Sequence, residues 1–539
     1  MEKQSINKSK IVKFVRGGGV FSLLLLFQIG MIFYFNFSDI RNSLDSDFAN
    51  TIYHFQEVIR NGTLNLENWN HTTSMELDAT FLFAVPVYYL IHNIYTAVGI
   101  ANMIYVVLYI VTICGIFRGL QVKKRYLFFT LCLVLTPYSF GMLEYFNMMF
   151  YGGACYSLKT LVPLLFIWLF MLFERQGERK REKGLKAIVL LLYFFLLFVT
   201  SFSTGFYVML CGILPLFGCM ILDILKTGAW SGRYRRSQIG LAAGSVIVFV
   251  TGYLLHQKFY GLISRNGMML TKIENYAVNF RACVRGIFDV FGATFSEDIR
   301  ALSPEGLWYC LKMGFVVLLL IVLGVRMFRL FQKRQRPDVR DFLTVLPLFN
   351  FLVLLIADSR YSANTHIEYR YYLIGAVPLL LLLGIQLDEW EEKWNGFQKN
   401  ILLLLSGAAL ALLMAGNNVE VIRRWDRTSY AVELCNYFNT LDVESVFFVN
   451  DPDTAHICKG IDANHKFGTF LSDTQSLELS ICSYYESEYG SFYGGKNALA
   501  VFIYTVPEDY MPEEIASHYR KVGTVRWFEI YVGDEVLFP

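Results

Sequence analysis

Two carboxylates, Asp45 and Asp47, stand near the start of an acidic stretch. Residues 37–97 hold seven acidic and two basic residues and follow the first apolar segment of the chain. A carboxylate at a water–lipid boundary can take a proton from a hydroxyl during group transfer, so either residue is a candidate general base. The other interpretation is that one of them caps a helix that begins here, and we assign that capping role to Asp45 or Ser46.

A third candidate catalytic carboxylate is Glu144, the only acidic residue in the segment 144–157, which reads EYFNMMFYGGACYS. It follows the third apolar segment directly and stands among tyrosine, phenylalanine and asparagine residues. The alternative is an interfacial anchor whose carboxylate reaches water beside aromatic side chains.

Basic and aromatic residues gather in a later segment, RYSANTHIEYRYYLIGAVPLL, which leads into the tenth apolar segment. A guanidinium at a membrane surface can hold a lipid phosphate through paired hydrogen bonds. The alternative is that Arg370 pairs with Glu368 or is simply solvated. The candidate phosphate-binding residues are Arg360, His366, Arg370 and Tyr371.

The cysteine and histidine residues predict no metal site. The ten cysteines are scattered, with no CxxC pair and no Cys/His cluster at the spacing of metal ligands. We therefore predict no cofactor, and the sequence leaves a divalent metal open without indicating one. No nucleic-acid-binding motif accompanies the basic clusters, so we expect no nucleic-acid partner.

Membrane spans must position these candidate residues. Of the 539 residues, 55% are hydrophobic and 17% are charged, which excludes a disordered chain and an ordinary soluble enzyme. A helical span needs about 20 apolar residues to cross about 30 Å of hydrocarbon. Eleven segments meet this requirement: 18–36, 98–117, 126–143, 158–173, 187–203, 206–225, 238–256, 306–325, 341–357, 372–387 and 400–416.

The lysine and arginine residues predict the orientation of the spans. Alternate connecting segments hold 27 of them in 77 residues, whereas the remaining connections hold 11 in 146. Because basic connections stay in the cytoplasm, we expect a cytoplasmic N-terminus and an outside C-terminus in a bacterial plasma membrane. Segment 79–97 would reverse every later connection if it crossed, so we predict a short helix or re-entrant piece on the outer face.

The predicted outer loop 37–97 contains an amphipathic helix. This helix would lie in the membrane interface and would end at Asn61-Gly62, because glycine readily adopts the left-handed conformation that ends helices. The apolar residues that recur at helical spacing are Phe48, Ile52, Phe55 and Ile59.

The predicted fold class is an all-α polytopic membrane protein with a small extracytoplasmic α/β domain. The membrane domain covers residues 1–416 and the α/β domain covers 417–539, where the apolar spans stop and charged residues become frequent. In the second domain, alternating and continuous apolar patterns predict helices, strands and a hairpin. These are helices at 431–441 and 512–521, strands at 445–451 and 498–504, and a hairpin over 525–538 that turns at Gly533-Asp534.

This arrangement resembles the GT-C membrane glycosyltransferases that use polyprenyl-phosphate-linked sugars. One span is followed by a long outer loop in which Asp47 opens a helix and precedes Gly62 by fifteen residues. Later, Arg370-Tyr371-Tyr372 precedes an apolar span that contains Pro378. The stretches SLDSDFANTIYHF and NWNHTTSMELDAT are further similar to uncharacterised Gram-positive members.

The resemblance implies a function and roles for three residues. Asp47 would be the catalytic base, Arg370 would bind the donor phosphate, and Glu144 would be a further acidic residue of the site. We expect an inverting outer-face glycosyltransferase that moves a sugar from a polyprenyl-phosphate donor to a cell-envelope glycan. Its partners would be the lipid-linked donor, a glycan or lipid-linked acceptor, and membrane lipids.

Two other functions stay open. A polysaccharide polymerase or ligase with a lipid diphosphate donor would use a long basic loop, and the predicted outer loop 257–305 holds six lysine and arginine residues. A non-enzymatic flippase or transporter for lipid-linked sugars would place ionisable residues inside its spans. The predicted spans hold almost none there, which disfavours transport.

Overall fold

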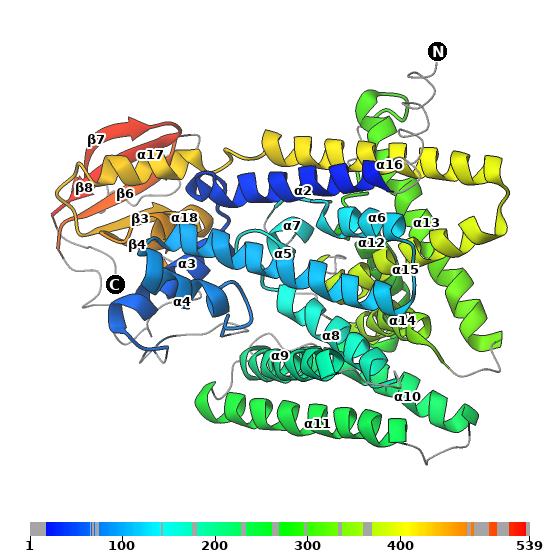
Figure 1. Cartoon of the computed structure of the whole chain (residues 1–539). Helices are drawn as coiled ribbons and strands as arrows, with labels where there is room; N and C mark the ends of the chain where they lie inside the picture. Colours follow the sequence, from blue (N-terminus) through cyan, green and yellow to red (C-terminus); the bar gives the residue numbers. More distant parts are fainter. Residues whose placement is uncertain are drawn as a thin grey trace. The chain divides into compact units, whose positions relative to one another are not determined.

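The computed structural model, drawn in Figure 1, divides into two compact units that are described separately. Unit 1 comprises Met1–Phe35, Glu76–Ala79 and Asn102–Val421. Unit 2 comprises Asn36–Met75, Thr80–Ala101 and Ile422–Pro539. The residues that the structure describes are 18–64, 66, 69, 75–141, 144–174, 180–227, 233–260, 269–295, 299–332, 337–358, 369–471, 476–478, 495–503 and 517–534.

Nine of the described helices are long and apolar enough to cross a membrane, and each matches a predicted span. The chain is therefore a multi-pass membrane protein, while its orientation stays a prediction. These helices are α2 (Gly19–Phe37), α5 (Ile94–Gly119), α8 (Ser157–Glu174), α9 (Lys180–Thr204), α11 (Arg233–Tyr260), α13 (Pro304–Gln332), α14 (Val339–Ile356), α15 (Leu373–Lys393) and α16 (Gly396–Arg423).

Burial separates the interior helices of unit 1 from its peripheral ones. Nearly every side chain of α8 and α15 is buried, as expected for helices that are apolar on all sides and surrounded by protein. In contrast, α11 and α16 expose most of their apolar side chains, which suits a lipid surrounding. Figure 1 shows α11 lying along α9, and the two helices are in contact.

The predicted span 126–143 is only partly helical. Helix α6 (Lys124–Leu135) ends after 12 residues, and Thr136 has an extended backbone conformation. The cause is Pro137, which cannot donate a backbone hydrogen bond and disfavours helical geometry in the residue before it. The following residues up to 141 are irregular in backbone and buried.

Ring contacts show that the chain from Phe129 to Phe146 still extends over much of the thickness of a membrane. Phe129 packs on Phe21 near the start of α2, with ring centroids 5.5 Å apart, and Phe146 packs on Phe35 near its end at 5.7 Å. Fourteen residues of helix between Phe21 and Phe35 correspond to about 21 Å. Irregular backbone at such depth is tolerated where protein surrounds it, as it does here.

Two other apolar segments form shorter helices. The predicted span 206–225 starts with a π-helical turn, η2 (Met209–Ile213), which continues into α10 (Leu214–Thr227). Within 79–97, α4 (Phe81–Ile91) has 11 residues, or about 16 Å, and is too short to cross a membrane. The prediction of a short helix there is confirmed, and its placement on the outer face stays a prediction.

The basic loop 257–305 carries local structure in its described parts. Strand β1 (Met269–Leu270) pairs antiparallel with β2 (Ala357–Asp358), and η3 (Ile273–Asn275) leads into α12 (Tyr276–Val290). The side-chain amide of Asn279 donates to the carbonyl oxygens of Leu354 and Leu355 at 3.0 and 2.6 Å, which ties α12 to the end of α14.

Unit 2 contains a six-stranded mixed sheet with the order β5-β4-β3-β6-β8-β7. Its central strands β4, β3 and β6 run parallel, and the predicted strands at 445–451 and 498–504 are confirmed as β3 and β6. Helix α17 (Ser429–Phe438) confirms the helix predicted at 431–441. The strands are β3 (Ser445–Val449), β4 (Lys466–Leu471), β5 (Ser476–Glu478), β6 (Asn497–Phe502), β7 (Arg520–Val525) and β8 (Phe528–Gly533).

The predicted hairpin turn at Gly533-Asp534 is wrong. The hairpin joins β7 to β8, with Val525 opposite Phe528, so the turn is formed by Arg526 and Trp527. Arg526 adopts the left-handed conformation that such turns require, at a φ of 51°. Gly533 lies at the end of β8 instead. The helix predicted at 512–521 is wrong at its end, where Arg520 and Lys521 belong to β7, and residues 512–516 lie outside the described residues.

The predicted outer loop packs with the C-terminal segment inside unit 2. Helix α3 (Ser46–Asn61) lies against α18 (Pro452–Ile461), and η1 (Ile40–Ser43) lies against α17. The Thr428 backbone N–H donates to the Asn42 carbonyl oxygen at 2.9 Å. The loop and the C-terminal segment thus share one compact unit, although they are far apart in the sequence.

Candidate active site

The start of α3 separates the two candidate bases of the outer loop. Asp45 is the N-cap: its carboxylate accepts from the Phe48 backbone N–H at 2.8 Å and lies 3.4 Å from the Arg427 guanidinium. The Asp45 side chain is only 7% exposed, and one of its oxygens contacts Phe48 while the other contacts Arg427. Asp47, in the first turn, has an exposed side chain. The predicted cap is thus confirmed at Asp45.

The helix that carries Asp47 is firmly supported within unit 2. A Cβ at Gly460 of α18 would meet the Ala49 backbone at 2.8 Å, so the two helices approach closely because Gly460 has no side chain. The Lys459 ammonium lies 4.1 Å from the centroid of the Tyr53 ring, a close cation–π contact. On another face of α3, His54 stacks against Trp69, with ring centroids 4.8 Å apart.

The predicted amphipathic helix is confirmed, while its place in the membrane interface stays a prediction. The predicted apolar residues Phe48, Ile52 and Phe55 are buried, and the helix ends at Gly62 as predicted. However, the polar side chains of Asn50 and Glu57 are buried as well. Protein therefore covers α3 on more than its apolar face.

A buried histidine lies on the helix that supports α3. His456 of α18 is 9% exposed, and burial together with the nearby Lys459 ammonium lowers its pKa to about 4. Its imidazole is therefore neutral at physiological pH.

In unit 1, Glu144 lies at the N-cap position of the short helix α7 (Tyr145–Met149) and is half-buried. Its carboxyl group lies over Gly141, where a Cβ would come within 2.9 Å of it. The Ser139 hydroxyl accepts from the Tyr145 backbone N–H at 3.0 Å, which fixes the start of α7. Helix α7 packs against η4 (Tyr369–Tyr372), the turn that contains Arg370.

Arg370 and Tyr371 lie in this turn, directly before α15. The Arg370 guanidinium is half-buried and stands 5.5 Å from the centroid of the Tyr371 ring. The turn is held because the Tyr371 carbonyl oxygen accepts from the Asn350 amide at 2.9 Å and from the Tyr207 hydroxyl at 3.4 Å. The other predicted phosphate ligands, Arg360 and His366, lie outside the described residues.

The structure adds a buried ion pair that the sequence reasoning missed. The Asp78 carboxylate lies 3.2 Å from the Lys159 ammonium, and both side chains are at least 96% buried. Asp78 also accepts from the hydroxyls of Ser203, at 2.8 Å, and Thr204, at 2.5 Å. Lys159 donates to the Cys155 carbonyl oxygen at 2.6 Å. The available signal was that Lys159 is the only basic residue in the segment 144–159.

A row of tyrosines connects Lys159 with Arg370. The Lys159 ammonium lies 4.8 Å from the Tyr156 ring, which packs on Tyr207 at 5.7 Å between centroids. Tyr207 in turn packs on Tyr371 at 6.5 Å, and Tyr371 carries the guanidinium of Arg370 over its ring. Unit 1 thus places two cations at the ends of an aromatic row, at one end of several helices.

A second ion pair, with a buried ammonium and a partly exposed carboxylate, lies between two apolar helices. The Lys312 ammonium of α13 is 2.7 Å from the Glu420 carboxylate of α16, which also accepts from the Trp308 indole at 2.5 Å. Lys159 and Lys312 both lie near the ends of predicted spans, and both ammonium groups are buried against carboxylates.

The candidate residues fall into the two compact units. Asp45 and Asp47 belong to unit 2, whereas Glu144, Arg370 and Tyr371 belong to unit 1, on neighbouring elements. The pairing of Asp47 with Arg370 in one cavity stays a prediction. Within the described ranges, no three His, Cys, Asp or Glu side chains gather closely enough to hold a metal ion.

Solved structures with a similar fold include two of the protein ArnT. No protein-family model and no curated protein matches this sequence. ArnT from Cupriavidus metallidurans in the apo state superimposes with a TM-score of 0.61 at 12% identity, over 95% of this chain and 97% of ArnT. The fold of this chain is similar to that of ArnT.

ArnT is also known with a ligand. The ArnT structure bound to undecaprenyl phosphate matches with a TM-score of 0.59 at 11% identity, over 96% of this chain and 98% of ArnT. The Archaeoglobus fulgidus oligosaccharyltransferase tethered to an acceptor peptide gives 0.46 at 10% identity, over 96% of this chain and 74% of its own. The ArnT-like fold confirms the predicted polytopic helical architecture with a small C-terminal sheet.

Proposed function

We propose that this protein is a glycosyltransferase that moves a sugar from a polyprenyl-phosphate donor to a cell-envelope glycan at the outer face of the membrane. The observation that carries this proposal is the ArnT-like fold, which extends over nearly the whole of both chains. ArnT binds undecaprenyl phosphate, a polyprenyl phosphate. A lipid-linked donor also suits an outer-face enzyme, because nucleotide sugars are not available outside the cell membrane.

The reaction needs a base on one side of the sugar and positive charge on the other. The acceptor hydroxyl oxygen attacks the anomeric carbon, and its proton passes to the base. The bond from that carbon to the phosphate oxygen breaks, and the bonding electrons leave with the polyprenyl phosphate. Because attack and departure take place on opposite faces, the anomeric configuration inverts. Preorganised charge at the leaving group is worth about 3–4 kcal/mol.

Asp47 suits the role of the base better than Asp45 does. The Asp45 carboxylate is occupied by the helix cap and by the Arg427 ion pair, and it is buried. Asp47 presents an exposed carboxylate on the same helix turn. Glu144 is half-buried beside the element that carries Arg370, which makes it a candidate for orienting the acceptor.

Arg370 suits the phosphate of the donor better than Lys159 does. The Lys159 ammonium is buried and neutralised by Asp78, so a phosphate would have to displace a carboxylate to reach it. Arg370 is half-buried in a turn whose backbone is held by Asn350 and Tyr207. A guanidinium on a fixed turn can bind two phosphate oxygens at once. Tyr371 beside it offers an aromatic face.

The direct test is sugar transfer by the purified full-length protein in proteoliposomes. Polyprenyl-phosphate sugars are supplied with cell-envelope glycan as the acceptor, and free polyprenyl phosphate and glycosylated acceptor are measured. We expect both products in equal amounts. Empty liposomes and protein carrying Asp47→Asn are the controls.

The same assay separates the two other functions when it is repeated with a lipid diphosphate donor and without an acceptor. A polymerase or ligase would act only on a lipid diphosphate donor and would release polyprenyl diphosphate. A flippase would move the lipid-linked sugar across the bilayer without any acceptor and would release no polyprenyl phosphate. Either result would overturn the proposed transfer reaction.

A further inference from the structure

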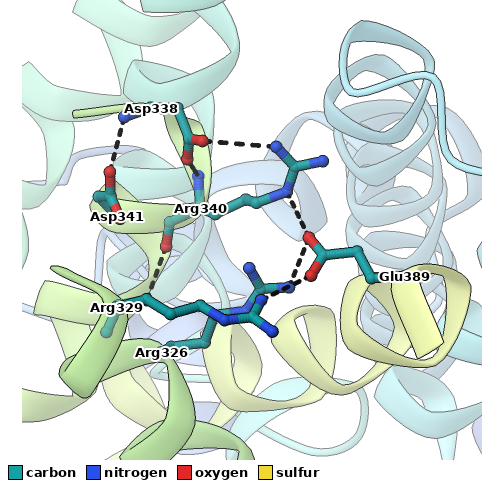
Figure 2. Close-up of polar contacts among 7 residues, drawn as sticks. Arg326, Arg329, Asp338, Arg340, Asp341 and Glu389 are labelled. Atoms are coloured by element: carbon teal, nitrogen blue, oxygen red, sulfur yellow. Dashed lines mark hydrogen bonds and ion pairs between the residues drawn. The ribbon is translucent and has the colours of Figure 1, made fainter. Parts of the chain in front are cut away.

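Three arginines converge on one carboxylate in unit 1, as Figure 2 shows. The Glu389 carboxylate of α15 lies 2.8 Å from Arg326 and from Arg329, both of α13, and 2.9 Å from Arg340 of α14. Asp338 adds a longer contact to Arg340 at 3.4 Å, but it also caps α14 through the Arg340 backbone N–H at 2.8 Å. We call Arg326, Arg329 and Arg340 the arginine cluster.

The Asp341 carboxylate is turned away from the arginine cluster. Asp341 accepts from the Asp338 backbone N–H at 2.8 Å, and the two residues form a reciprocal capping box at the start of α14. Figure 2 shows this bond on the far side of Arg340 from Glu389. Three guanidinium groups therefore meet one carboxylate at the centre of the cluster.

A second group of charges on the same helix end shows the opposite balance. Lys123 lies 3.0 Å from Asp388, 3.7 Å from Glu391 and 3.5 Å from Glu392, and Arg125 also pairs with Glu391. There the carboxylates outnumber the cations. The end of α15 is thus acidic toward α6 and strongly basic toward α13 and α14.

The arginine cluster retains buried hydrogen-bonding capacity. The Arg326 side chain is 6% exposed, and its Nε makes no hydrogen bond with any described residue. The same holds for Nε of Arg340, although that atom is in ion-pair contact with Glu389. Burying a guanidinium with unsatisfied N–H groups is costly, so a structural tie between three helices would need fewer arginines than this. A further anion would satisfy them.

The position of the cluster points to a lipid. Glu389 lies nineteen residues after Arg370, so about 28 Å of helix separates it from the candidate active site. That end of the helices is the one that the charge distribution predicts to be cytoplasmic. On the same turns of α13, Phe328 and Phe331 are 62% and 79% exposed. Exposed phenylalanines beside arginines suit a ligand with an anionic head and an apolar chain.

We infer that the arginine cluster binds the phosphate group of an anionic membrane lipid in the leaflet opposite to the candidate active site. Arg329 and Arg340 are 39% and 31% exposed and can reach a phosphate from the membrane surface, while Arg326 completes the site from inside. Phe328 and Phe331 would contact the acyl chains. A free phosphate shares the head-group chemistry but has no apolar chain for the phenylalanines to contact.

The test measures lipid retention by the full-length protein in nanodiscs. Phosphatidylglycerol is titrated into phosphatidylcholine nanodiscs, and bound phosphatidylglycerol is counted by native mass spectrometry. Arg329→Gln and Arg340→Gln each remove one charged hydrogen-bond donor, so we expect about tenfold weaker retention. Each variant leaves Glu389 with two arginines, so the fold is retained. Arg329→Lys keeps the charge and should restore part of the binding.

Lys124→Gln is the matched control, because Lys124 is an exposed basic residue beside Lys123 at the same end of the bundle. It should retain phosphatidylglycerol as the wild type does. Equal retention by the wild type and both glutamine variants would overturn the inference. Displacement of phosphatidylglycerol by inorganic phosphate at an equal concentration would also overturn it, because the site would then take soluble phosphate rather than lipid.

Discussion

Asp78 and Asp47 come from the same predicted outer loop, but the structure uses them in opposite ways. The Asp78 carboxylate is fully buried in unit 1, where an ammonium and two hydroxyls satisfy it. Asp47 in unit 2 has an exposed side chain at the start of a helix whose cap is supplied by its neighbour Asp45. A carboxylate in a buried ion pair contributes to the fold, whereas an exposed carboxylate can exchange a proton with a substrate.

The largest effect is expected from breaking the ion pair between Asp78 and Lys159. Asp78→Asn leaves the buried Lys159 ammonium without its counter-charge, so we expect the protein to lose about 3–5 kcal/mol of stability. The loss is measured as a lower unfolding temperature and a lower abundance in membranes. The matched control is Asp39→Asn, since the Asp39–Arg41 pair is 43% exposed on both sides and should contribute less than about 1 kcal/mol.

A double variant distinguishes the ion pair from other effects of the substitution. Asp78→Asn combined with Lys159→Met removes both charges and keeps a similar side-chain volume, so most of the stability should return. If the double variant is as unstable as Asp78→Asn alone, the ion pair is not what holds this region.

The next largest effect is expected in the pH dependence of the stability of unit 2. The folded pKa of His456 is lowered to about 4 by burial, whereas the unfolded chain binds a proton near 6.5. Its stabilising contribution is therefore complete above about pH 6.5 and is lost as the pH falls toward 4, by roughly 3 kcal/mol. Unfolding by denaturant at several pH values measures this slope, which His456→Gln should flatten. His518→Gln, at an exposed histidine, should leave the slope unchanged.

Substitution of Arg370 should weaken binding of the donor and leave the fold intact. Arg370→Gln removes a charged donor of hydrogen bonds to phosphate, so the KM for the polyprenyl-phosphate sugar should rise about 10- to 100-fold, or about 1.5–3 kcal/mol. Arg370→Lys should restore part of the binding. Arg300→Gln, at an exposed arginine of the basic loop, should leave the KM unchanged. An unchanged KM in Arg370→Gln would remove Arg370 from the phosphate site.

The smallest effect is expected at the cap of α3. Asp45→Ala removes the acceptor for the Phe48 backbone N–H, so we expect a loss of about 1 kcal/mol in thermal or denaturant unfolding. Asp45→Asn keeps a good capping side chain and should cost less. Asp45→Ala also removes the ion pair with Arg427, so if Asp45→Asn costs as much stability as Asp45→Ala, the ion pair matters more than the cap.

Local signals in the sequence predicted the parts of the fold that depend on neighbouring residues. The helix from Asp45 to Gly62 was predictable because its cap and its terminating glycine are local. Strand β3 was predictable from its continuous run of buried apolar residues. The turn at Arg526 was missed, because a left-handed arginine has no strong sequence signal and the Gly533-Asp534 pair has one.

Contacts between distant residues account for the rest. Asp78 and Lys159 are 81 residues apart in the sequence, so neither could be recognised as half of an ion pair. The packing of α3 on α18 depends on Gly460, some 400 residues after the helix it contacts. For the same reason, the candidate site was predicted as separate segments, and the adjacency of α7 and η4 became visible only in the structure.

The central claim is that Asp47 is the base, and the most direct measurement compares two matched variants of one helix turn. Sugar transfer by Asp47→Asn and by Asp45→Asn is measured under single-turnover conditions with saturating donor, at equal protein abundance. Removing a general base costs about 10²- to 10⁴-fold in rate, so Asp47→Asn should fall by at least about 100-fold while Asp45→Asn stays within a few-fold of the wild type. Wild-type transfer by Asp47→Asn, with or without loss in Asp45→Asn, would contradict the account.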